Sequence, residues 1–149
     1  MKKILAAFLI AFSTLTLASC KEERSADALL RSFLSVYSAE GVVYSPTVAE
    51  GEDGYIDEPL FKKIYLYDGK MPTNFAVFLN SHTDSDSECA LFVCRDGTEL
   101  LSVEEMCLER LRLLTSPSGF IVRSGNTVFY STMSDKARAE RIWRSIISH

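Results

Sequence analysis

Apolar residues recur along this chain with two different spacings, and each spacing predicts a different kind of element. Helical spacing begins after Ser25, a good N-cap, and predicts a helix over about residues 25–39. The tripeptide Asp57-Glu58-Pro59 is typical of a helix start, and Asp68-Gly69-Lys70 would stop that short second helix. Two helices are therefore predicted in the first half of the domain, one on each side of residues 40–56.

The second half alternates strands and helices. Residues 74–80 and 88–94 are apolar on both faces, which is typical of strands that are central or covered on both sides. A helix is expected over 99–114, although Ser102-x-x-Glu105 matches a capping box and marks an alternative start. Strands at 120–124 and 127–132 would be joined by Gly125-Asn126, a favourable two-residue hairpin turn. Ser134 would cap the last helix.

Residues 40–56 are rich in glycine and acidic side chains and are harder to interpret. A loop of this length is unusual inside a compact domain, so Val42–Tyr44 is expected to pair as a short edge strand.

These elements predict an α+β fold. It would have about four antiparallel strands in two ββα units, with helices mainly on one face, preceded by an N-terminal helix. Residues 25–149 have a suitable length for a single domain of this kind.

The N-terminus carries the most specific pattern. Lys2 and Lys3 precede an apolar run from Ile4 to Leu17, which ends in Leu17-Ala18-Ser19-Cys20. A basic start, an apolar run and small residues before a cut site are typical of a cleaved signal peptide, here residues 1–19. The last four residues resemble the lipobox of bacterial lipoproteins, which implies lipid on Cys20, followed by a short spacer over 20–24. An ordinary secretory signal that releases a soluble protein is the alternative.

The length of the apolar run argues against a permanent membrane span. It has 14 residues, whereas a transmembrane helix needs roughly 20. A lipobox implies instead that acyl chains such as palmitate hold the protein at the membrane, and two chains give a stable anchor. We therefore expect an extracytoplasmic protein that is anchored to the cell membrane through Cys20.

Charge excludes some partners. The chain has 16 basic and 20 acidic residues, and cleavage before Cys20 would remove Lys2 and Lys3 but no acid. The resulting excess of about six acidic residues disfavours nucleic acid, which needs a basic footprint. It also disfavours electrostatic docking on anionic lipid, because no polybasic segment follows Cys20.

Three cysteines remain besides Cys20, and none has zinc-ligand spacing. Cys89 and Cys94 lie on one predicted strand and point to opposite faces, so they cannot form a disulfide with each other. We expect Cys89, Cys94 and Cys107 to be small buried hydrophobic residues. A Cys94–Cys107 or Cys89–Cys107 disulfide is the alternative.

Catalytic patterns are sparse. His82 lies beside Asp84, which suggests a general base, but the only other histidine is the terminal His149. A small cell-envelope hydrolase that uses His82 with nearby acids, or a reactive cysteine, is the alternative function. The acidic stretches 83–88 and 50–53 lack calcium-loop spacing, and we expect no metal or cofactor.

Two features favour binding instead. Four tyrosines in the first half of the domain could line a protein or peptide interface, or could equally pack in the core: Tyr44, Tyr55, Tyr65 and Tyr67. The last helix gathers Lys136, Arg138, Arg141 and Arg144, as a solvated face or as a patch for an anionic envelope polymer or an acidic partner.

Three stretches, together with the lipobox, resemble an uncharacterised family of small lipoproteins that carries a domain of unknown function and occurs mostly in Gram-positive bacteria. They are Glu88–Cys94, Met106–Leu111 and Gly125–Tyr130. The resemblance implies an extracytoplasmic lipoprotein and brings no catalytic residues. The sequence as a whole predicts a membrane-anchored, non-catalytic binding or interaction module, with the hydrolase and a ligand-free structural lipoprotein as alternatives.

Overall fold

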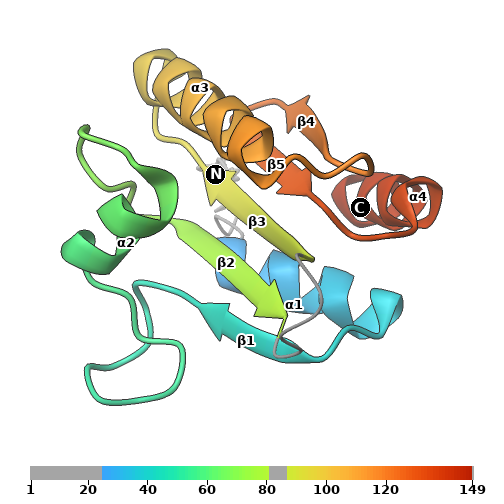
Figure 1. Ribbon diagram of the computed structural model, residues 1–149, viewed down its shortest axis with the longest axis horizontal. Helices are drawn as coiled ribbons and strands as arrows, with labels where there is room; N and C mark the ends of the chain where they lie inside the picture. Colours follow the sequence, from blue (N-terminus) through green and yellow to red (C-terminus); the bar gives the residue numbers. More distant parts are fainter. Residues whose placement is uncertain (1–24, 81–86, 149) are drawn as a thin grey trace, which may run out of the picture.

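The computed structural model describes residues 25–80 and 87–148. Figure 1 shows a central sheet with helices on either side of it. The elements, in chain order, are α1 (Ala26–Tyr37), β1 (Gly41–Tyr44), α2 (Glu58–Tyr65), β2 (Phe75–Asn80), β3 (Glu88–Val93), α3 (Gly97–Leu114), β4 (Phe120–Ser124), β5 (Thr127–Ser131) and α4 (Lys136–Ile147).

The predicted α+β class is confirmed, but the described residues form five strands and not four. All neighbours in the sheet are antiparallel, in the order β1-β2-β3-β5-β4. The fifth strand is β1, which pairs with β2 from Gly41↔Asn80 to Tyr44↔Val77, so the edge strand expected at Val42–Tyr44 is present. The predicted order of two ββα units after an N-terminal helix is also present.

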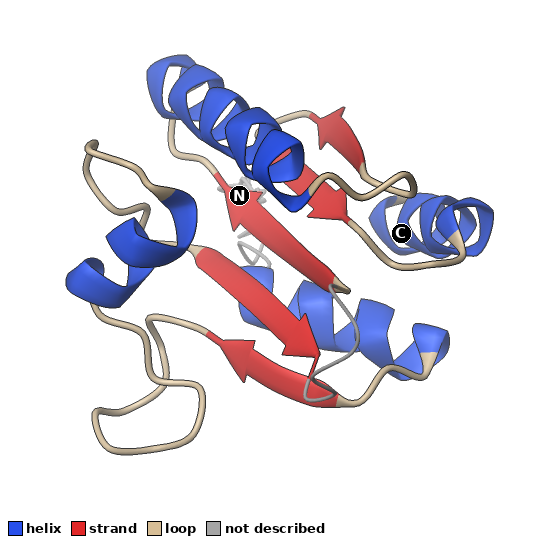
Figure 2. Ribbon diagram, viewed as in Figure 1, coloured by secondary structure: helices blue, strands red, loops and turns tan. Residues whose placement is uncertain are grey.

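The expectation that helices lie mainly on one face is wrong. Helices α1 and α4 cover one face of the sheet, and α2 and α3 cover the other (Figure 2). The reason lies in β2 and β3, whose side chains on both faces are apolar and buried. A strand of that kind must be covered on both sides, and two helices are available for each side.

The sheet therefore divides the interior into two cores. The α1–α4 core contains Phe33, Leu91, Phe129 and Trp143, and the Trp143 ring stacks on Phe129 at a centroid distance of 4.4 Å. The α2–α3 core is centred on aromatic side chains of α2, β2, β3 and β5: Phe61, Tyr65, Phe75, Phe92 and Tyr130.

Two helix starts differ from prediction. Helix α3 is capped by Asp96, whose carboxylate accepts hydrogen bonds from the backbone N–H groups of Thr98 and Glu99, so the alternative start at Ser102 is wrong. Helix α4 is capped by Asp135 and not by Ser134. In both cases an aspartate satisfies the free N–H groups of the first turn and its charge favours the helix dipole.

Residues 45–57 return to the edge of β1. The backbone N–H of Ser45 donates to the carbonyl of Gly54 at 3.0 Å, and Ser45 also forms a parallel bridge with Tyr55. Gly54 has φ +93°, and a Cβ there would lie 2.3 Å from the Val43 carbonyl oxygen. Glycine is thus required for this close approach, which covers one end of the β1 edge.

Candidate functional site

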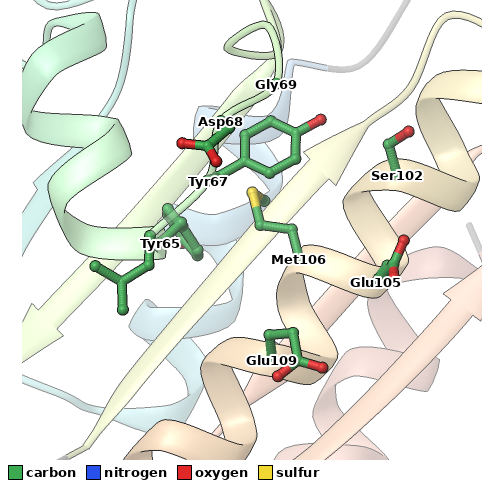
Figure 3. Close-up of a pocket in the computed structure, with 9 residues that line it drawn as sticks. Tyr65, Tyr67, Asp68, Gly69, Ser102, Glu105, Met106 and Glu109 are labelled. Atoms are coloured by element: carbon green, nitrogen blue, oxygen red, sulfur yellow. The ribbon is translucent and has the colours of Figure 1, made fainter.

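A shallow depression of about 330 Å³ lies between α3 and the loop that follows α2 (Figure 3). Its lining combines aromatic, apolar and acidic side chains from these two segments: Tyr65, Leu66, Tyr67, Asp68, Gly69, Ser102, Glu105, Met106 and Glu109. Buried Met106 supplies an apolar base, and Asp68, Glu105 and Glu109 are exposed around it. A surface of this composition suits a ligand with both apolar and basic groups.

Tyr67 is held in place by its neighbours. Its ring meets Phe61 edge-on, with centroids 6.3 Å apart and an angle of 81° between the planes. A Cβ at Gly69 would lie 2.3 Å from atoms of the Tyr67 ring. Glycine therefore leaves the space that the ring occupies, and the aromatic wall of the depression is fixed before any ligand arrives.

Leu66 is the most exposed large apolar side chain of the described residues, at 70%. It ends α2 in the left-handed conformation, with φ 49°, which costs a leucine roughly 1 kcal/mol or more. The turn places an apolar side chain on the rim of the depression, where no protein neighbour buries it.

A buried ion pair links α3 to the sheet and to the end of α2. Glu88, the first residue of β3, accepts two hydrogen bonds from Arg110 of α3: from Nε at 2.8 Å and from Nη2 at 2.6 Å. The Glu88 side chain is 5% exposed and the Arg110 side chain 20%. Arg110 Nη1 also donates to the Ile64 carbonyl at the end of α2, at 2.9 Å. One guanidinium therefore joins α2, α3 and the sheet.

Two buried tyrosines complete this network. Tyr130 Oη donates to Glu88 Oε1 at 2.6 Å, and the Tyr65 hydroxyl lies 3.0 Å from that of Tyr130. Burial is the main cause that raises the pKa of both phenols well above the ordinary value, and Glu88 adds to the rise. The hydrogen bond to Glu88 is the main reason that the pKa of Arg110 is raised. Arg110 therefore stays charged and the two phenols stay neutral.

This arrangement favours a structural role for the network. Both Glu88 oxygens are occupied by a guanidinium, and one also by a phenol, so the carboxylate is not free to move a proton to or from a ligand. What the network does is fix the end of α2 against α3. The two walls of the depression are thereby held at a set distance, which lowers the entropy cost of binding.

The prediction that Cys89, Cys94 and Cys107 are buried is confirmed. All three are buried free thiols. Burial raises the pKa of Cys94 to about 11, and raises the pKa of Cys89 and of Cys107 well above the ordinary value, so none is an activated nucleophile. Cys89 faces the α1–α4 core, whereas Cys94 and Cys107 face the α2–α3 core. A Cys89–Cys107 disulfide is therefore excluded by the sheet between them.

Several predicted residues lie outside the described ranges: Cys20 with the signal peptide, His82, Asp84 and His149. Of the tyrosines proposed for an interface, Tyr67 lines the depression, Tyr65 is buried in the network, and Tyr44 and Tyr55 are half-buried at the β1 edge.

Sequence reasoning missed Glu88, Arg110 and Tyr130 as a group. Two signals were available. Glu88 is a charged residue at the start of an otherwise apolar strand, and Arg110 continues the buried stripe of α3 at helical spacing from Met106 and Cys107.

Among the described residues, no helix is both long and apolar enough to cross a bilayer. The same residues contain no cluster of three or more His, Cys, Asp or Glu side chains suited to a metal ion. Comparison of the chain with protein-family models, with curated proteins and with solved structures gives no significant match.

Proposed function

We propose that this protein is an extracytoplasmic lipoprotein, anchored to the cell membrane through Cys20, that acts as a non-catalytic binding module. Its ligand site is the depression between α3 and the loop after α2. We also infer that it belongs to the uncharacterised family of small bacterial lipoproteins that its lipobox and strand patterns resemble.

The anchor is supported by the sequence around Cys20. Leu17-Ala18-Ser19-Cys20 follows a basic start and an apolar run, and a cysteine at that position is the acceptor that lipidation requires. Two acyl chains would bury many methylene groups, each contributing about 0.8 kcal/mol, so the attachment would be stable.

One observation carries the binding role: the preorganised depression with an exposed apolar rim. Tyr67 is fixed by Phe61 and Gly69, and the network around Glu88 fixes the walls. Leu66 is held in solvent by a strained backbone. An exposed apolar side chain on a strained turn is typical of a binding site, because a ligand that covers Leu66 removes its apolar surface from water.

The anchor is tested by mass spectrometry of the mature protein and by cell fractionation. We expect the mature chain to begin at Cys20 with a diacylglyceryl thioether and to sediment with membranes. Cys20→Ser should move the protein out of the membrane fraction, whereas Lys21→Ala should leave it there. An unmodified Cys20 in the mature chain would contradict the anchor.

The ligand site is tested by photo-crosslinking in intact cells. A photoreactive amino acid in place of Leu66 should give a discrete adduct, because this side chain is exposed on the rim of the depression. The matched control is the same amino acid in place of Leu113, which is 53% exposed on α3 but does not line the depression. Adding Met106→Lys, which puts a charge at the base, should abolish the Leu66 adduct. Identical adducts from both positions would contradict the proposed site.

A further inference from the structure

The last helix, α4, carries a basic surface on the side of the molecule opposite the depression. Its buried side is formed by Ala139 and Trp143. Exposed cations occupy the other side: Lys136, Arg138, Arg141 and Arg144. The nearby acids are Asp135, which caps the helix, and the half-buried Glu140. We call the exposed residues Arg138, Arg141 and Arg144 the α4 basic face.

Tertiary packing places this face beside the helix that follows the proposed anchor. The first turn of α4 meets the last turn of α1: Arg138 Nη2 donates to the Val36 carbonyl at 3.2 Å, and its guanidinium lies 4.9 Å from the centre of the Tyr37 ring. The backbone N–H of Asp135 donates to the Tyr37 hydroxyl at 3.2 Å. Figure 1 shows α1 and α4 together on one side of the sheet.

An exposed apolar residue adjoins the arginines. Val36 is 57% exposed, and among the described residues it is the one large apolar side chain of the α1–α4 layer left in solvent to this extent. Clustered basic side chains are attracted to anionic headgroups, and an exposed apolar side chain beside them can enter the boundary between headgroups and acyl chains.

We propose that the α4 basic face, with Val36, docks on the anionic lipid surface of the membrane that holds the anchor. The inference rests on the proposed lipidation of Cys20. Ser25 lies five positions after Cys20, so the start of α1 would stay within about 18 Å of the lipidated residue even with the spacer fully extended. The α1–α4 layer is thereby kept near the headgroups.

Charge sets the orientation. Helix α3, in the opposite layer, has four acidic residues, Glu99, Glu104, Glu105 and Glu109, and two arginines. Arg95, Arg112 and Arg123 pair with three of these glutamates, and α2 carries Lys62 and Lys63, so this layer has no comparable excess of positive charge. An anionic surface therefore attracts the α4 side more strongly than the α3 side. With α4 on the lipid, the depression faces away from the bilayer, toward partners in the envelope. A lipid surface is favoured over a soluble anionic polymer because the anchor supplies it locally and because Val36 suits an acyl boundary.

The test uses the lipidated protein in phosphatidylcholine vesicles with and without phosphatidylglycerol. A fluorophore is attached at Ser145→Cys on the exposed side of α4 or at Leu101→Cys on α3, and a lipid-borne quencher reports proximity. We expect quenching at position 145 only with phosphatidylglycerol, its loss at high ionic strength, and little quenching at position 101.

The decisive variant is Arg141→Glu with Arg144→Glu. Each basic side chain near an anionic bilayer contributes roughly a fivefold increase in the binding constant, so the equilibrium constant for docking should fall by at least about tenfold. Lys63→Glu with Lys70→Glu makes the same change in charge on the other layer and should have no such effect. Equal effects of the two pairs, or quenching independent of phosphatidylglycerol, would overturn the proposal.

Two further readouts separate this inference from the anchor. Co-flotation with either type of vesicle requires only the acyl chains on Cys20. A protein that floats with the vesicles but shows no quenching at position 145 therefore has the anchor but does not dock, which would overturn the proposal. Soluble polyphosphate is added as a competitor. Arginine-dependent binding of polyphosphate without quenching by phosphatidylglycerol vesicles would assign the face to a soluble polymer and overturn the lipid proposal.

Discussion

Glu88 and Arg110 are the two residues that organise the α2–α3 half of the molecule. The glutamate side chain is 5% exposed, and the pair makes further hydrogen bonds to Tyr130 and to the Ile64 carbonyl. A buried pair of this kind adds little stability compared with apolar side chains of the same shape. Removing one partner is costly, because the other charge is left buried.

Single substitutions in this pair should therefore be strongly destabilising. We expect Glu88→Gln or Arg110→Met to lower the free energy of unfolding by about 2–4 kcal/mol, and the double variant to lose clearly less than the sum of the two. Urea unfolding followed by Trp143 fluorescence measures both the losses and the coupling.

Arg112, two residues further along α3, provides the matched control. It forms an exposed pair with Glu109, and pairs of that kind contribute little. Arg112→Ala should change the free energy of unfolding by no more than about 0.5 kcal/mol. A cost of Arg110→Met as small as that of Arg112→Ala would contradict the role assigned to the buried pair.

At the scale of elements, local sequence patterns placed most helices and strands within a few residues. Strands β2 and β3 were located because every residue from Phe75 to Phe78 and from Cys89 to Val93 is apolar. The β4–β5 hairpin follows from Gly125-Asn126, since Gly125 adopts φ 58° at the turn. These signals are local, so no tertiary information was needed.

Element ends were less accurate where two caps competed. Asp96 and Asp135 displaced Ser102 and Ser134 as helix caps. Periodicity alone does not decide between neighbouring residues that can all accept a backbone hydrogen bond. Which residue caps the helix depends on where the preceding strand ends, here β3 before α3 and β5 before α4.

Helix α3 shows how one element can serve two purposes. Its core side contributes Leu100, Val103 and Cys107 to the α2–α3 core, while Ser102, Glu105 and Glu109 line the depression. The sequence indicates the amphipathic stripe. It does not indicate that α2 and its following loop lie against the adjacent side, because that contact joins segments about 40 residues apart.

At the scale of the whole molecule, buried ionisable groups lie on both sides of the sheet, and they make stability depend on pH in the alkaline range. The pKa values of Tyr65, Tyr130, Cys89 and Cys107 are all raised by burial in the folded protein. Above the ordinary pKa values the unfolded chain releases protons that the folded chain retains. Raising the pH therefore favours unfolding.

We expect the free energy of unfolding to be constant up to about pH 8.5 and then to fall. The slope should approach about 1.4 kcal/mol per pH unit for each group once the pH exceeds that group's unfolded pKa. Tyr65→Phe keeps the ring and removes one ionisable hydroxyl. The decrease in the free energy of unfolding per pH unit, between about pH 10 and pH 11, should therefore be smaller by the contribution of one group. Urea unfolding at a series of pH values checks this, and an unchanged slope in Tyr65→Phe would contradict it.

Charged side chains are also distributed unevenly between the two sides of the sheet. Basic residues of α4 lie on one side of the sheet and the acidic residues of α3 on the other. Net charge by itself disfavours any attraction to anionic lipid, because it sums over both sides. Only the packing of α4 against α1 brings a basic face next to the helix that begins at Ala26.

The sequence by itself determined the class of fold, the positions of the elements, the burial of the three cysteines and the prediction of a lipid anchor at Cys20. All of these follow from local spacing and residue chemistry, which are written along the chain. Tertiary structure decided that helices cover both faces of the sheet, that Glu88 meets Arg110 and Tyr130, and that Tyr67 closes a depression beside α3. These features depend on contacts between distant segments, and such contacts are set by how two apolar faces of one sheet are shared among four helices.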